Sequence, residues 1–206
     1  MEKINTPQHY MRGDNRRIEI ACAARTLIVE KGYAALRTRD VAVRVGISVS
    51  TMHFHVPTKT DLIVLVAETT LDEFIRLLPS PPSPEVAARD QLRAEIEAYY
   101  DSLNEREELA ACYIQLTHVA HYEPQIATIL DAFEQGWCQR YVEILKIGRT
   151  QGAFRADLSP LPAALVITGA LTAFGTRGPQ KLEMFWPVFD EIERGFLSRS
   201  QGGKDL

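Results

Sequence analysis

The chain has 206 residues, 46% of them hydrophobic and 24% charged, which predicts one or two soluble globular domains. No stretch reaches the roughly 18 uninterrupted apolar residues of a membrane span, and the N-terminus through Arg17 has no apolar run typical of a secretory signal. The three cysteines, Cys22, Cys112 and Cys138, are widely spaced, which indicates a reduced cytoplasmic protein without a disulfide framework or zinc finger.

Charge is distributed unevenly along the chain, although the formal net charge is only −4. Residues 1–62 contain ten Lys and Arg against six Asp and Glu, whereas residues 63–206 contain thirteen against twenty-one. A basic first part on an acidic remainder suggests a polyanionic partner for the first part. Chance fluctuation is the alternative that charge alone leaves open.

Three helices are predicted in the first part of the chain. The first follows Asp14, a candidate N-cap, and ends at Gly32, where a left-handed C-cap is expected. The second covers residues 38–45 and has Thr38 as its expected N-cap. The third begins after Ser48, a further N-cap residue, and Pro57 ends it.

The rest of the chain is also predicted to be helical, so the expected fold is all-α. Thr58 and Asp61 form a variant of the capping box at the start of a helix over residues 59–78. The proline-rich segment 79–84 is the one clear internal joint. The remaining predicted helices cover 85–103, 107–121, 125–150 and 159–175, with Ser159-Pro160 as an N-cap followed by the first helical residue. A last helix ends near Ser198 and either begins at Pro187 or is kinked there, before a frayed tail.

The histidines of the third helix, His53 and His55, are one residue apart, as in some metal sites. On a strand such residues share a face, but on a helix they lie about 200° apart. No Asp, Glu or Cys stands near enough in sequence to complete a ligand set, so no metal is predicted.

The helical periodicity of the third helix instead separates an inner and an outer face. Met52 and Val56 are expected to pack inward, and Ser50, His53 and Phe54 outward. A short helix, a tight glycine turn and a second helix with a polar outer face are typical of a helix-turn-helix, whose second helix enters the DNA major groove. A solvated helical hairpin inside a larger bundle is the alternative at this stage.

Specific residues at fixed spacing run through this segment: Ala23-Ala24, Leu27, Gly32, Thr38, Val41-Ala42, Gly46-Ile47-Ser48, Thr51-Met52, His55, Lys59 and Leu62. With these matches, residues 14–62 resemble the N-terminal DNA-binding domain of the TetR (tetracycline repressor) family. The sequence departs from the family at His53, where Tyr is usual, at Val56, where Phe is commoner, and at Ser50, where Gly is frequent.

The resemblance implies a DNA-binding domain over residues 1–62, with a flexible arm over 1–13, and a ligand-binding and dimerisation domain over 63–206. It also implies DNA contacts by Thr38, Arg39, Ser48, Val49, Ser50, Thr51, His53, Phe54, His55 and Lys59. The phosphate contacts would come from Thr38, Thr51, His55 and Lys59, the base-edge contacts from Arg39, Val49, Ser50 and His53, and Phe54 would lie on sugar or backbone. Backbone contacts by Arg12, Arg16 and Arg17 are further expectations.

For the acidic part, the resemblance implies a homodimer through the last two long helices, 159–175 and 187–198, and a pocket for a small molecule. Candidate ligand-binding residues are Tyr99, Leu103, Tyr113, Leu116, Phe133, Trp137 and Phe174, although each of them taken singly fits ordinary core better than a ligand contact. His118 and His121 share a helical face and are either surface residues or contacts to a metal or ligand carboxylate.

The predicted function is a ligand-responsive transcriptional regulator: a repressor that binds a palindromic DNA operator as a dimer and is released by a small hydrophobic or aromatic effector. No cofactor and no membrane partner are predicted. An enzyme is disfavoured because the chain has no Gly-x-Ser-x-Gly, P-loop or His-Glu-x-x-His motif. A helical adaptor or small-molecule-binding protein without a DNA role is the alternative.

Overall fold

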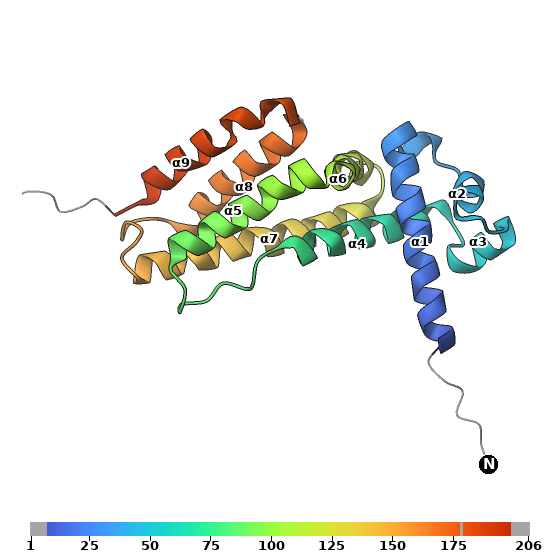
Figure 1. The fold of residues 1–206 in the computed structure, drawn as a ribbon, viewed down its shortest axis with the longest axis horizontal. Coiled ribbons are helices and arrows are strands. Elements are labelled where there is room, and N and C mark those ends of the chain that lie inside the picture. The colour runs from blue at the N-terminus through green and yellow to red at the C-terminus, as the bar shows by residue number, and fades with distance from the viewer. Residues whose placement is uncertain (1–7, 178, 199–206) are drawn as a thin grey trace, which may run out of the picture. The chain divides into compact units, whose positions relative to one another are not determined.

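The structure is a computed structural model that describes the backbone of residues 8–177 and 179–198, and the side chains of residues 15–176 and 182–198. Within these ranges the chain forms nine α-helices, two short 3-10 helices and no strand, which confirms the all-α prediction (Figure 1). The elements are α1 (Gln8–Lys31), η1 (Tyr33–Ala35), α2 (Thr38–Val45), α3 (Val49–His55), α4 (Lys59–Leu77), α5 (Ala88–Glu105), α6 (Glu107–Ala120), α7 (Pro124–Thr150), α8 (Pro160–Arg177), η2 (Pro179–Met184) and α9 (Phe185–Phe196). None of the described helices is long and apolar enough to cross a membrane.

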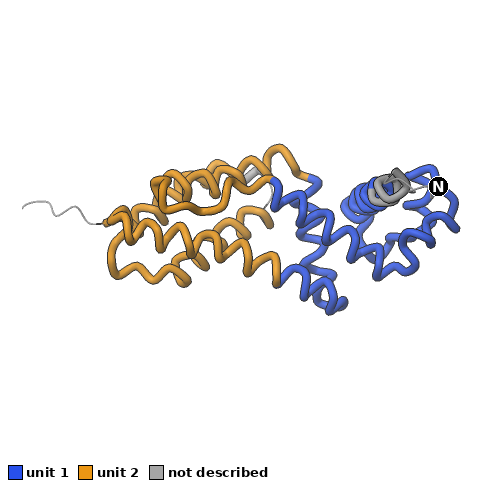
Figure 2. Tube along the Cα trace, turned by 90° about the horizontal axis from the view of Figure 1, so that it is seen from below, with its two compact units in different colours: residues 1–76, 108–131 blue, residues 77–107, 132–206 orange. Residues whose placement is uncertain are grey.

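The helices group into two compact units (Figure 2). The first unit comprises residues 1–76 and 108–131, and the second comprises residues 77–107 and 132–206. The predicted functional boundary between residues 62 and 63 falls inside α4 and stays a prediction.

The first unit is held together by a small apolar core under α1, α2, α3 and the start of α4. Helix α1 contributes Ile20 and Ile28, and α3 contributes Met52; all three side chains are completely buried. The helical spacing of these residues places them on the inner face of each helix, so burying them fixes the rotation of α3 about its own axis.

Two of the predicted helix caps are confirmed. The Ser48 hydroxyl accepts a hydrogen bond from the Thr51 backbone N–H at 3.0 Å. Asp61 and Thr58 cap each other reciprocally: the Thr58 N–H donates to Asp61 Oδ2 at 3.0 Å, and the Asp61 N–H donates to Thr58 Oγ1 at 3.0 Å. These side chains satisfy backbone donors that have no partner inside the helix.

Three other predicted helix ends are wrong in detail. Helix α1 begins at Gln8 instead of after Asp14, since no proline stands between them to stop the helix. The N-cap of α2 is Arg37, in extended conformation, and Thr38 is already the first helical residue. Gly32 has a positive φ of 79° but a ψ of 158°, which is not the left-handed helical conformation expected of it.

The second unit is a bundle of α5, the part of α7 from residue 132 onward, α8 and α9 around an aromatic core. Phe185, Phe189 and Phe174 pack there at ring-centroid distances of 4.6–6.2 Å. The Phe154 ring packs directly on Gly148 of α7. A Cβ at this position would lie 2.0 Å from the ring, so only glycine fits here without a shift of the ring.

Two prolines lie in the first turns of helices in the second unit. Pro160 is the first residue of α8, as predicted. Pro187 neither begins nor visibly interrupts α9, which starts two residues earlier at Phe185. It lies in the first turn, where the missing N–H would have had no intrahelical acceptor.

Candidate nucleic-acid interface and ligand-binding unit

Helices α2 and α3 are joined by a tight turn at Gly46. This glycine adopts the left-handed conformation (φ 74°, ψ 33°), which costs other residues free energy. The Ile47 N–H donates to the Ala42 carbonyl at 2.9 Å, closing the turn. Helix α3 is anchored from behind by Met52 and Val56, whose exposed fractions are 0% and 1%.

The opposite face of α3 is open to solvent, as the helical spacing predicted. Ser50 and His53 are exposed, and Phe54 keeps 83% of its surface accessible. Val49 and Thr51 are also exposed, and His55 is half-buried with its ring edge-on to Phe54 at 5.2 Å. An exposed phenylalanine beside hydroxyl and imidazole groups is a surface suited to a partner that has both apolar and polar groups.

The hydroxyl groups at the start of α3 form a cluster. Ser48 Oγ lies 2.8 Å from the hydroxyl oxygens of both Ser50 and Thr51. The cluster holds the first turn of α3 in place, because one of its hydroxyls accepts from the Thr51 N–H.

Replacing Ser48 by alanine removes this cap. We expect the free energy of unfolding to fall by about 1 kcal/mol, because the Thr51 N–H loses its acceptor. Chemical denaturation followed by circular dichroism measures the loss. Ser50→Ala is the control and should change stability by less than about 0.5 kcal/mol, since Ser50 caps no backbone donor; equal losses in both variants would contradict the assignment.

Several basic residues predicted to contact DNA make contacts within the protein. Lys59 Nζ lies 4.4 Å from the centre of the Tyr33 ring and donates to the Ala34 carbonyl at 3.4 Å. Arg39 faces Asp40 at 3.6 Å in an exposed pair that contributes little stability. Arg16 pairs with Glu19 one turn away. The side chain of Arg12 lies outside the described residues.

Arg17 has a role that the sequence did not reveal. Its guanidinium donates to the His55 carbonyl at 2.8 Å, so a residue of α1 caps the C-terminus of α3. A cation at a helix C-terminus is favourable because the last carbonyls have no other partner. No local pattern links residues so far apart in sequence.

Polar contacts also tie α1 and η1 to later helices of the first unit. Arg25 pairs with Glu73 of α4 at 2.9 Å and with Glu108 of α6 at 3.4 Å. The Tyr33 hydroxyl donates to Glu123 at 3.1 Å. Burial, and then this carboxylate, raise the pKa of Tyr33 to about 12.

The predicted ligand-binding residues are divided between the two units. Tyr113 and Leu116 lie in the first unit, where Tyr113 meets Phe74 edge-on at 5.9 Å and Leu116 is fully buried. The other five lie in the second unit: Tyr99, Leu103, Phe133, Trp137 and Phe174. There Tyr99 and Trp137 stack with ring centres 5.5 Å apart. Their role in ligand binding stays a prediction.

The second unit contains polar atoms deep in its core. Glu95 is 2% exposed and its Oε1 accepts from Arg140 Nε at 2.9 Å, while its Oε2 has no hydrogen-bond partner among the described residues. The Tyr141 hydroxyl is completely buried and has no well-aligned partner there; Trp137, whose ring packs edge-on to that of Tyr141, makes only a weak polar contact with it. Burial raises the pKa of Glu95 despite Arg140, and burial followed by the charge of Glu95 raises the pKa of Tyr141.

An unpaired buried hydroxyl destabilises the fold, so Tyr141→Phe is expected to raise the free energy of unfolding by about 1 kcal/mol. Tyr33→Phe is the matched control, because the same atom is removed from a hydroxyl that is bonded to Glu123. That variant should lose about 1 kcal/mol. Thermal or urea unfolding measures both; a loss in Tyr141→Phe equal to the control would mean that its hydroxyl is paired.

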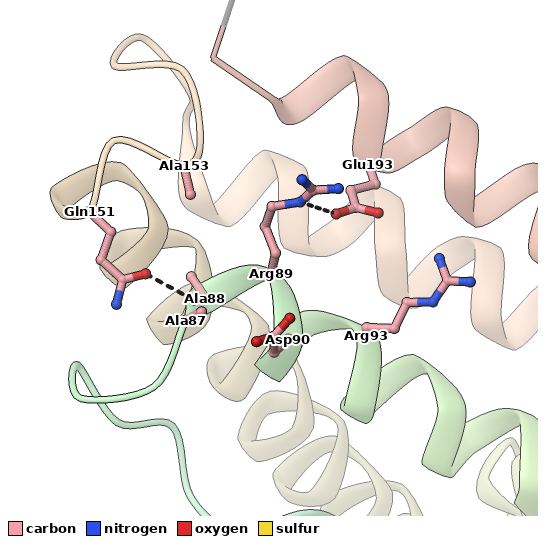
Figure 3. A pocket seen from close by; sticks show the side chains of 8 residues that line it. All are labelled: Ala87, Ala88, Arg89, Asp90, Arg93, Gln151, Ala153 and Glu193. Carbon is pink, nitrogen blue, oxygen red and sulfur yellow. Dashed lines mark hydrogen bonds and ion pairs between the residues drawn. The ribbon is translucent and has the colours of Figure 1, made fainter.

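A surface cavity of about 430 Å³ lies in the second unit (Figure 3). It is lined by Ala87, Ala88, Arg89, Asp90, Arg93, Gln151, Ala153 and Glu193. Arg89 pairs with Glu193 at 2.8 Å and Arg93 with Asp190 at 2.7 Å, which ties α5 to α9. The lining combines charged and amide side chains with three alanines, and it includes none of the predicted ligand-binding residues.

His118 and His121 are both exposed. His121 Nδ1 lies 2.9 Å from the Thr117 carbonyl one turn earlier. Among the residues whose positions are described, no group of three His, Cys, Asp or Glu side chains is arranged to hold a metal ion.

The buried anchor, the glycine turn and the open outer face of α3 define a helix-turn-helix protein. Residues 20–66 match the sequence profile described as bacterial regulatory proteins, tetR family. Over this segment the chain resembles the TetR family, and the relatives that match beyond it are transcriptional regulators.

Two curated relatives are regulators and not enzymes. The transcriptional activator FasR of Mycolicibacterium smegmatis is 26% identical over 114 residues, 55% of this chain and 51% of FasR, so the chain matches about half of that relative. The transcriptional repressor KstR2 of Rhodococcus jostii is 24% identical over 144 residues, 69% of this chain and 70% of KstR2. A TetR transcription regulator from Haloarcula marismortui has the same fold, with a TM-score of 0.81, 17% identity, and coverage of 90% of this chain and 100% of that one.

Proposed function

We propose that the protein is a repressor that binds a palindromic DNA operator as a homodimer and is released by a small hydrophobic or aromatic effector. The observation that carries the proposal is the outer face of α3, on which Ser50, His53 and Phe54 are exposed while Met52 and Val56 hold the helix from behind. A helix of this kind fits the major groove. Operator binding would place the protein with the DNA, in the cytoplasm.

The proposed contacts follow the exposure of each side chain. Ser50, His53 and Val49 would meet base edges, Phe54 would pack on sugar, and Thr51 would reach a phosphate. Thr38, Arg39, Ser48, His55 and Lys59 would complete the interface, with Lys59 leaving the Tyr33 ring to reach the backbone. Residues 1–62 would form the DNA-binding part and residues 63–206 the part that dimerises and binds the effector.

A dimer is proposed from the surface of α8. Leu161, Leu165 and Val166 are 53–56% exposed, and no charged residue occurs between Leu161 and Thr176. An open, uncharged helical face of this length is typical of a subunit interface. Two copies related by a twofold axis present two α3 helices to successive major grooves.

An aromatic or apolar effector is supported by the composition of the second unit. The Tyr99–Trp137 stack and the phenylalanine cluster offer flat apolar surface, and the unpaired atoms of Glu95 and Tyr141 offer polar contacts nearby. Apolar walls with a few polar groups are characteristic of small-molecule sites.

A gel-shift assay with DNA from the protein's own promoter region, at 50 and 200 mM salt, tests the proposal. We expect binding that resists competitor DNA and weakens at least about 1,000-fold over this range, as phosphate contacts require. A promoter–reporter fusion in cells with and without the protein then tests the direction of control, and lower output with the protein is expected. An adaptor or a small-molecule-binding protein without a DNA role would give no shift at either salt concentration.

A further inference from the structure

The side chain of His53 is held in one orientation on the outer face of α3. Its Nδ1 lies 3.1 Å from the carbonyl oxygen of Pro57, just beyond the helix. A peptide carbonyl has lone pairs and no hydrogen, so the hydrogen of this bond must be on Nδ1.

This bond determines what the other ring nitrogen offers. A neutral imidazole carries a single N–H, so Nε2 is left with a lone pair and can only accept a hydrogen bond. Nε2 is on the far side of the ring from Nδ1, on a side chain that is exposed to solvent. No hydrogen bond to Nε2 occurs among the described residues.

An acceptor at this position discriminates between the groups that DNA presents. Phosphate oxygens are acceptors, and so are guanine N7 and O6 and thymine O4. In the major groove only the amino groups of adenine (N6) and cytosine (N4) donate. Nε2 of a neutral His53 can therefore accept a hydrogen bond from an amino group. It cannot bond to the other polar groups that α3 would meet, because these are also acceptors.

We propose that His53 reads an exocyclic amino group in the major groove, of adenine or cytosine, through Nε2. The inference rests on the proposed function, because it assumes that α3 enters the major groove. It makes His53 a determinant of sequence preference, in contrast to the phosphate contacts proposed for Thr51 and Lys59.

The test begins with selection of binding sequences from a random duplex pool at pH 8.0. Each adenine of the selected site is then replaced by purine, and each cytosine by 2-pyrimidinone, which removes only the amino group. Wild type, His53→Phe and His121→Phe are compared on every duplex. His121 is the matched control, since its Nδ1 also contacts a carbonyl, that of Thr117 at 2.9 Å, but it lies on α6.

We expect one position per half-site at which amino-group removal weakens wild-type and His121→Phe binding about 10-fold or more. At that position, removing the amino group should not weaken DNA binding by His53→Phe any further. At the other positions the affinity of this variant should change as that of wild type does. Whether the sensitive base is adenine or cytosine identifies the source of the amino group. Unchanged circular dichroism and retained salt-dependent DNA binding establish that His53→Phe is folded.

The inference is overturned if wild type and His53→Phe respond alike at every position of a selected site, a result that leaves the proposed function intact. If the pool yields no selected sequence at all, the proposed function itself fails, and the reading of His53 fails with it.

Discussion

Replacing Leu165 by glutamate is expected to convert the protein from dimer to monomer and to weaken operator binding about 100-fold or more. Leu165 is 56% exposed at the middle of the uncharged face of α8, so a carboxylate there would be buried without a partner when two copies meet. A monomer has a single α3 helix to place on the operator. It therefore loses the gain in affinity that two linked binding modules provide, which is typically about 100-fold or greater. Sedimentation equilibrium measures the association, and a gel shift measures the affinity.

Val86→Glu is the control for this change. Val86 also belongs to the second unit and is 47% exposed, but it precedes α5 and is not part of the α8 face. This variant should remain a dimer with wild-type affinity. A Leu165→Glu protein that stays dimeric would exclude the α8 face as the interface, and a monomer that keeps full affinity would exclude the dimeric mode of DNA binding.

Replacing Arg140 by methionine is expected to lower the free energy of unfolding by about 3–5 kcal/mol, because it leaves the carboxylate of Glu95 buried without its cation. Arg140 also donates to the carbonyls of Pro79 at 2.8 Å and Ser80 at 3.1 Å, so the proline-rich joint loses its attachment to α7. Urea denaturation measures the loss. Lys146→Met, on the same helix, removes an exposed pair with Glu143 at 3.0 Å and should cost at most about 1 kcal/mol.

The stability lost in Arg140→Met should also depend on pH, and the loss should be smaller at low pH. Burial already raises the pKa of Glu95 while Arg140 opposes the rise, so losing Arg140 raises it further. A carboxyl whose pKa is higher in the folded state binds its proton preferentially there, so lowering the pH from 8 to 5 should restore part of the lost stability. A defect that stays constant over this range would mean that the uncompensated charge of Glu95 is not its cause.

The double variant Glu95→Leu/Arg140→Met provides an independent check. It removes both charges, so it should be more stable than Arg140→Met alone. If the double variant is as unstable as the single one, the lost contacts to Pro79 and Ser80 account for the defect and the buried charge does not.

The sequence by itself determined the helix-turn-helix segment closely. The end of α2 and both ends of α3 depend on residues within a few positions of each other: Gly46 allows the turn, Ser48 caps α3, and Pro57 follows its last turn. The spacing of Met52 and Val56 likewise predicted which face of α3 is buried. Such features are readable because caps, turns and helical periodicity act over one or two turns of chain.

Only the tertiary structure decided which distant residues meet. Arg17 reaches the His55 carbonyl across 38 positions, Arg140 reaches Glu95 across 45, and Tyr33 reaches Glu123 across 90. The same is true of the division of the predicted ligand-binding residues between two units, which separates Tyr113 from Tyr99. These pairings depend on how whole helices pack, and packing is set by the summed burial of many side chains and not by any local pattern.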